Sequence, residues 1–192
     1  MRVSRAQATE NRLKVIDVAS QLFREHGFDG IGLNDLMKGA GLTQGGFYKQ
    51  FESKEDLAAK ACARAMEHAS ERWSAAASAQ PERPFDALID FYLSPGHRDE
   101  TAKGCPIVAL GSDAARHGAD VKASFEPGVK AHLDVLDGHM AVVDGENPRA
   151  KSMAVLATMV GALLLSRSVS DKTLSEGFLE AAAAEIRRAV AT

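Results

Sequence analysis

Hydrophobic residues recur along this chain at spacings of three and four, which is the period of one face of an α-helix. Val15, Val18 and Leu22 form such a face near the N-terminus, and Leu174 and Phe178 begin another near the C-terminus. No segment alternates apolar and polar residues in the manner of a half-buried strand. The pattern therefore predicts an all-α fold.

Glycine and proline divide this pattern into separate helices. Residues 94–104 and 144–148 combine several turn-forming residues and are predicted to be loops. Residues 54–79 contain neither glycine nor proline, so we expect one long helix there that links two domains. The other expected helices are residues 9–25 with Thr9 as the N-cap, 35–40, a short one beginning after Thr43, 85–93, 105–116, 120–140, 149–167 and 174–190.

The segment DLMKGAGLTQGGFYKQFESK, residues 35–54, has the pattern of a helix-turn-helix motif. Gly41 stands where a first helix would end in a left-handed cap, and Thr43 stands where the next helix would be capped. Two helices joined by a short turn containing glycine form the motif, and the second helix of such a motif enters the DNA major groove. We therefore expect a three-helix DNA-binding domain in residues 1–52, followed by a helical domain in residues 53–192.

The residues of the second helix suit contact with DNA. Gly45 and Gly46 each cost about 1 kcal/mol of helix propensity relative to alanine, but they let the backbone approach a flat partner. Gln44 can pair with an adenine edge. Phosphate contacts are expected from Thr43, Tyr48, Lys49 and Lys54, which have side chains that position a protein on DNA without reading its sequence.

The motifs GLTQGGFYKQFESKEDL, residues 41–57, and FREHGFDGIGLNDL, residues 23–36, resemble the signature of TetR/AcrR-type transcriptional regulators. The chain departs from that signature at Gly32 and Leu33, where the family usually has a threonine-containing helix start, and Leu33 is kept as a DNA-facing candidate. The resemblance implies a ligand-responsive repressor that acts as a homodimer on a palindromic operator. The residues 53–192 would then form its ligand-binding and dimerisation domain.

The resemblance also implies a small-molecule inducer site and a dimer interface. Family members bind ligands between the linking helix and the helices that follow it, and they dimerise through their two final helices. The candidate ligand-binding residues are Met66, Trp73, Phe91, Tyr92, Cys105, Leu110, Phe125 and Met140. The candidate dimer residues are Leu156, Val160, Leu164, Phe178, Ala182 and Ile186. Apolar residues at helical spacing are also what an ordinary core requires, so both sets have that alternative interpretation.

Cys105 suggests a second mode of regulation. It precedes Pro106 at a predicted helix start and follows Lys103, and a helix N-terminus lowers the pKa of a thiol. The hypothesis is a redox- or electrophile-sensing repressor that acts through Cys105. The alternative is a small buried hydrophobic residue, which is how free cysteine commonly behaves.

Net charge and the lack of catalytic motifs bear on which partner and which activity we expect. The net charge is −3, with nine Lys and Arg against eight Asp and Glu in residues 1–60, so any attraction to DNA must be local. We find no catalytic motif and predict no enzyme activity and no cofactor. A helical binding or enzymatic domain without DNA is the alternative, which the paired glycines and Lys49 disfavour.

Metal binding and membrane insertion are not expected either. His132 and His139 lie seven residues apart without a cysteine or carboxylate to complete a ligand set. The longest apolar run, residues 153–165, is too short to span a bilayer. With no signal peptide in residues 1–20 and two cysteines in all, the chain is expected to be cytoplasmic.

Overall fold

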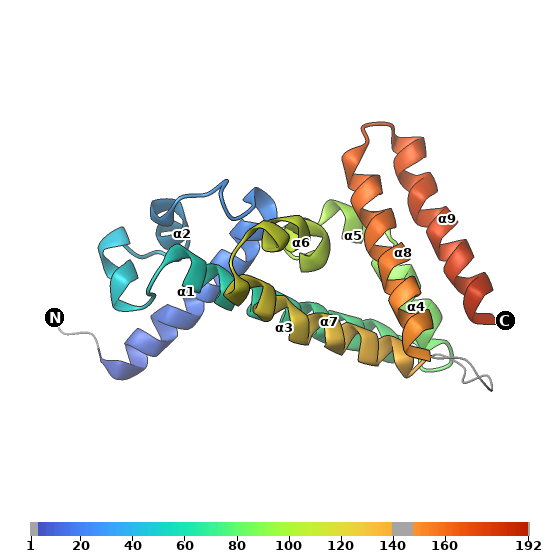
Figure 1. The fold of residues 1–192 in the computed structure, drawn as a ribbon, viewed down its shortest axis with the longest axis horizontal. Helices are drawn as coiled ribbons and strands as arrows, with labels where there is room; N and C mark the ends of the chain where they lie inside the picture. Colours follow the sequence, from blue (N-terminus) through green and yellow to red (C-terminus); the bar gives the residue numbers. More distant parts are fainter. Residues whose placement is uncertain (1–3, 140–147, 192) are drawn as a thin grey trace.

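The computed structural model describes residues 4–139 and 148–191, and every regular element in those residues is a helix. The all-α prediction is confirmed (Figure 1). The elements are α1 Arg5–His26, α2 Leu33–Gly39, the 3-10 helix η1 Gln44–Lys49, α3 Lys54–Ala79, α4 Pro84–Tyr92, α5 Pro95–Asp99, α6 Pro106–Arg116, α7 Ala119–Asp137, α8 Pro148–Ser168 and α9 Lys172–Ala191.

The first three elements, α1, α2 and η1, gather at one end of the molecule (Figure 1). Phe23, Leu36 and Phe47 are fully buried among them. Helix α1 begins four residues before the predicted start, because Ser4 accepts a hydrogen bond from the backbone N–H of Gln7 at 3.1 Å. Thr9, which we expected to be the cap, bonds back to a carbonyl inside the helix.

Helix α3 has the predicted bounds. The Ser53 hydroxyl accepts from the backbone N–H of Asp56 at 3.0 Å, and the Asp56 carboxylate accepts from the N–H of Glu52 at 3.2 Å. These two bonds satisfy backbone N–H groups at the helix start, where no preceding helical turn supplies carbonyl acceptors. From this start α3 runs beside α7 toward the far end of the molecule (Figure 1).

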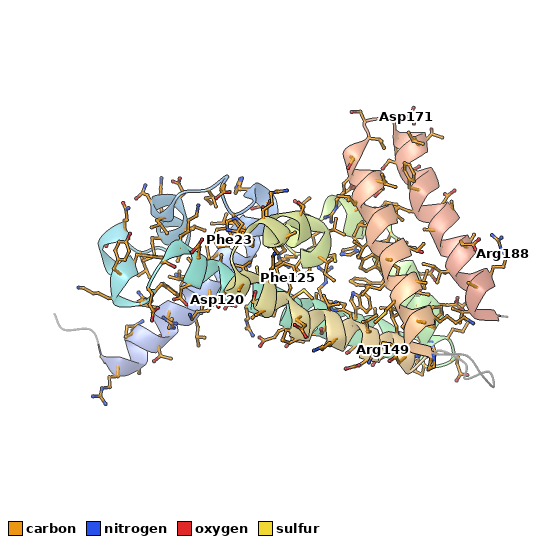
Figure 2. The ribbon with its side chains drawn as sticks, viewed as in Figure 1. Phe23, Asp120, Phe125, Arg149, Asp171 and Arg188 are labelled. Atoms are coloured by element: carbon orange, nitrogen blue, oxygen red, sulfur yellow. The ribbon has the colours of Figure 1, made fainter. Side chains whose placement is uncertain are left out.

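The hydrophobic core does not break at the predicted domain boundary. One buried cluster joins Phe23 and Phe47 of the N-terminal elements to Met66 of α3 and Phe125 of α7. Phe23 and Phe125, both labelled in Figure 2, belong to this one cluster. A displacement of α3 or α7 must therefore disturb the packing of the N-terminal elements, since protein cores are close-packed.

The C-terminal helices α8 and α9 lie side by side as an antiparallel pair at the other end of the molecule (Figure 1). Of the described helices, α8 is long and apolar enough to cross a membrane by length and composition, with a mean hydropathy of 1.3. It packs against α9, α7 and α6 inside a folded core, and one such helix is weak evidence for a membrane span.

One prediction about the loops is wrong. Residues 94–104 are not all loop, because Ser94 caps the short helix α5 by accepting from the N–H of His97 at 3.1 Å. Pro127 lies inside α7, which begins at Ala119 and continues to Asp137. The predicted loop 144–148 lies mostly outside the described residues.

Candidate DNA-binding surface and ligand site

The element η1 displays the predicted DNA-contacting residues. Phe47 is fully buried and holds the element to the core, whereas the side chain of Tyr48 is 72% exposed. The exposed residues of this element and its start include Thr43, Gln44, Gly45 and Lys49. Gly41, with φ of +73°, makes the left-handed turn that precedes them. The structure thus brings the predicted base-reading and phosphate-contacting side chains onto one exposed turn.

The details of this turn differ from the prediction in two ways. It is a 3-10 helix and not an α-helix, and Thr43 makes no capping hydrogen bond with its side chain. The Thr43 hydroxyl therefore remains available for a phosphate. Lys54 is half-buried at the first position of α3, whereas Leu33 packs against the N-terminal core at the start of α2.

Within the described residues, Gly45 has no steric reason to be glycine. A Cβ atom built there meets nothing within 4 Å, and one at Gly46 meets only the terminal methyl of Met37 at 3.8 Å. Neither residue has a positive φ. Neither steric contact within the described residues nor backbone conformation therefore requires glycine at position 45.

The predicted ligand residues are distributed over several environments. Tyr92, Leu110 and Phe125 are buried in the core. Trp73, Phe91 and Cys105 line a slot of about 10 Å³, with room for about one water molecule. Met66 lines a larger groove, and Met140 lies outside the described residues.

Cys105 does not have the exposure expected of a reactive thiol. It is the N-cap of α6, as predicted, but it is 3% exposed, and burial raises its pKa. The desolvation of the thiolate outweighs the helix N-terminus and the neighbouring Tyr92 hydroxyl. The predicted lowering of the thiol pKa is therefore wrong, and the structure favours a buried structural cysteine.

His97 fixes the start of α6. Its Nδ1 lies 2.7 Å from the carbonyl oxygen of Tyr92, so Nδ1 must carry the proton. Its Nε2 then accepts from the backbone N–H of Cys105 at 3.1 Å. Burial lowers the pKa of His97 to about 4, so the imidazole is neutral at pH 7.

Among the described residues no group of three or more His, Cys, Asp or Glu could hold a metal ion. His132 is buried and donates from Nδ1 to the carbonyl oxygen of Gly128 at 2.7 Å. Its ring also lies 4.2 Å from that of Trp73, edge to face. His97 and His132 thus both have structural roles in the core.

Sequence reasoning missed a groove between α3 and α7, which we call the α3–α7 groove. Its volume is about 500 Å³, within the range of small-molecule sites. It is lined by Ala63, Met66, Glu67, Ser70 and Glu71 of α3 and by Ser124, Pro127, Gly128 and Ala131 of α7. Small residues at helical spacing on both helices were the available signal.

The linking helix α3 is not the sole mechanical connection between the two parts of the chain. Buried Arg24 of α1 donates to the carbonyl oxygen of Gly104 at 3.1 Å, directly before α6. The backbone N–H of Phe28 donates to the carboxylate of Asp113 on α6 at 3.2 Å. The α6 region is therefore hydrogen-bonded to the end of α1 and to the residues that follow it, so α3 is joined by a second connection between the two parts of the chain.

The final two helices expose an apolar face that differs from the predicted one. Leu156, Ala182 and Ile186 are buried in the chain's own core, and Val160 and Phe178 are half-buried. Leu164 is 48% exposed, as a dimer residue should be. The other large exposed apolar side chains on these helices are Met153, Leu165 and Leu174.

Comparison with known proteins agrees with this arrangement. Residues 15–61 match the family model described as bacterial regulatory proteins of the tetR family, and these residues span α1 through η1 and the start of α3. Residues 15–61 are therefore similar to the N-terminal segment of tetR-family regulatory proteins. The exposed η1, Gln44–Lys49, lies within the matched residues.

Two relatives that match over most of their length are named as transcriptional regulators. The HTH-type transcriptional repressor NemR of Escherichia coli is 24% identical over 95% of both chains. The HTH-type transcriptional regulator LmrA of Bacillus subtilis is 24% identical over 85% of this chain and 90% of that protein. The crystal structure of reduced E. coli NemR has a TM-score of 0.78 at 22% identity, covering 95% of this chain and 99% of that one. The crystal structure of a TetR transcriptional regulator from Chloroflexus aurantiacus has a TM-score of 0.75 at 22% identity, covering 95% of this chain and 97% of that one.

Proposed function

We propose that this protein is a ligand-responsive transcriptional repressor that acts as a homodimer on palindromic operator DNA in the cytoplasm. The single observation that carries the proposal is η1, an exposed turn of DNA-contacting residue types in which Gly45 faces open space. Packing explains buried Phe47 but not this surface. Residues 1–52 would bind the operator, and residues 53–192 would bind the inducer and the second subunit.

On DNA, the parts of η1 would have different tasks. Gln44 would read one base edge in each half-site, since a glutamine amide can pair with adenine in two places. Thr43, Tyr48 and Lys49 would contact phosphates, together with Lys54 at the start of α3. Gly45 and Gly46 would let the backbone lie close to the groove.

Release of DNA would follow from a shift between two states of the dimer. An inducer must bind the state that is unable to hold DNA more tightly than the other state. A tenfold loss of DNA affinity requires about 1.4 kcal/mol of coupling. Helix α3, the shared core and the contacts of α6 with α1 supply the connection from the C-terminal helices to η1.

The dimer would form through α8 and α9, whose exposed apolar side chains are otherwise left in water. Two such pairs can assemble into a four-helix bundle around a two-fold axis. A two-fold protein requires a near-palindromic operator, with half-sites about one helical turn apart or slightly more.

The salt dependence of DNA binding tests the proposal. Fluorescence anisotropy of a labelled duplex should show affinity that falls linearly on a log–log plot with salt concentration. Lys49→Ala should make that slope shallower by about 0.9 for each phosphate that the variant no longer neutralises. Lys130→Ala changes an exposed lysine of α7, is the matched control and should leave the slope unchanged. Absence of salt-dependent binding, or equal slopes for both variants, would contradict the proposal.

A further inference from the structure

The α3–α7 groove is hollow because both of its walls carry small residues. Ala63 and Ser70 of α3 are seven residues apart, and Ser124 and Ala131 of α7 are likewise seven apart, so each pair lies on one helix face. Between these faces the floor is the buried side chain of Met66. The result is an apolar surface with a volume that suits an organic molecule of moderate size.

The charges at this groove are acidic on one side. Glu67 and Glu71 both line it from α3, and both are exposed. Glu67 is paired with Arg64 at 3.2 Å, and Arg64 is also held by Asp17 at 2.7 Å. Within the described part of the chain, Glu71 has no ion-pair partner. Its carboxylate is therefore the uncompensated charge at the groove.

We infer that the α3–α7 groove binds an amphipathic organic monocation, with its apolar body against Met66 and Pro127 and its charge beside Glu71. The inference rests on the proposed function, because it specifies the chemical class of the inducer. An anion of the same shape would be repelled by Glu71. A neutral molecule would cover that carboxylate without compensating the lost hydration, which carries a cost.

The position of the groove connects its occupant to the DNA-binding elements. The two helices approach so closely here that a Cβ atom on Gly128 would lie 2.5 Å from the Cβ of Met66. Met66 also belongs to the buried cluster that contains Phe23 and Phe47. A molecule pressed against Met66 thus acts on α3 and on the packing beneath η1 together.

Two hydrophobic ions of matched shape and opposite charge provide the test. Isothermal titration of the full-length protein should detect binding of tetraphenylphosphonium and no binding, or at least tenfold weaker binding, of tetraphenylborate. Glu71→Gln should weaken tetraphenylphosphonium binding about tenfold. Ala63→Trp, which fills the groove from an exposed position, should abolish it. Glu126→Gln, an exposed change elsewhere on α7, is the control and should bind as the parent protein does.

The outcomes separate this inference from the function on which it rests. Equal binding of both ions, no binding of either ion, or binding that Glu71→Gln and Ala63→Trp leave intact would overturn the inference. DNA binding by the ligand-free protein tests the proposed function independently. A protein that binds its operator but not tetraphenylphosphonium would therefore disprove the inference alone.

Discussion

At Gly45, an added side chain should have opposite effects on folding stability and on DNA affinity. Because a Cβ atom meets nothing there and φ is negative, Gly45→Ala should leave the free energy of unfolding unchanged or raise it by about 0.5–1 kcal/mol. If the backbone of η1 lies close to DNA, the added methyl should weaken DNA binding at least tenfold. Urea unfolding and fluorescence anisotropy measure the two quantities on the same preparation.

Gly111→Ala is the matched control for that experiment. Gly111 lies inside α6, where an added Cβ would make an ordinary contact with Ile107 at 3.8 Å. This variant should gain similar stability and keep its DNA affinity. If Gly45→Ala also binds DNA normally, the backbone of η1 does not approach DNA closely.

The imidazole of His97 should make the protein less stable in acid. Its folded-state pKa of about 4 lies below the ordinary value of 6.5, so the unfolded chain binds this proton first. The stability contributed by His97 is complete above pH 6.5 and is lost as the pH falls toward 4, by about 3 kcal/mol in total.

Urea unfolding at several pH values between 6.5 and 4 measures this loss. His97→Gln should reduce the slope of the unfolding free energy against pH by up to about 1.4 kcal/mol per pH unit. His26→Asn changes an exposed histidine and should keep the slope of the parent protein. A slope in His97→Gln equal to that of the parent would contradict the role assigned to His97.

Cys105 shows what a sequence can and cannot reveal about a single residue. The Cys-Pro pair correctly predicts a helix start, because proline favours the first helical position. The protonation of the thiol depends on Tyr92, Arg167 and the other groups that fold around it. Those neighbours are remote in the sequence, so the burial that raises its pKa could not be predicted.

At the scale of elements, the contact of α6 with α1 should control the local stability of residues 27–31. Asp113→Ala removes the acceptor of the Phe28 N–H and should speed hydrogen exchange of that amide, with a cost of about 1–3 kcal/mol. Both Asp113→Ala and Asp113→Asn lose the ion pair with Arg116, but Asp113→Asn retains an acceptor oxygen for the Phe28 N–H. In Asp113→Asn the Phe28 amide should therefore exchange nearly as slowly as in the parent protein. Equal exchange rates in the two variants would show that this hydrogen bond does not hold α1 to α6.

The elements differ in how far local sequence determined them. Helix α3 was predictable to the residue, because Ser53 caps it locally and no breaker interrupts it before residue 80. Helix α5 was missed because its proline and glycine also suit a turn, although Ser94 and Pro95 form a cap and first position. The α3–α7 groove joins segments about 60 residues apart, and no local pattern shows which helices pack together.

At the scale of the whole molecule, the exposed apolar face of α8 and α9 should join two subunits. Leu164→Glu places a charge in that face and should yield a monomer with at least tenfold weaker DNA binding. Sedimentation velocity at micromolar concentration measures the mass directly. Leu13→Glu alters a leucine on α1 that is more exposed than Leu164, and this variant should remain dimeric. A parent protein that sediments as a monomer would contradict the dimer.

The account depends most on the claim that η1 reads DNA as part of a two-fold dimer. Selection of duplexes from a random library by the purified protein tests this claim most directly. The account predicts one enriched, near-palindromic site, and it predicts that Gln44→Ala relaxes one base position in each half-site by roughly 1–3 kcal/mol. No enriched sequence, a site without two-fold symmetry, or an unchanged site for Gln44→Ala would contradict it.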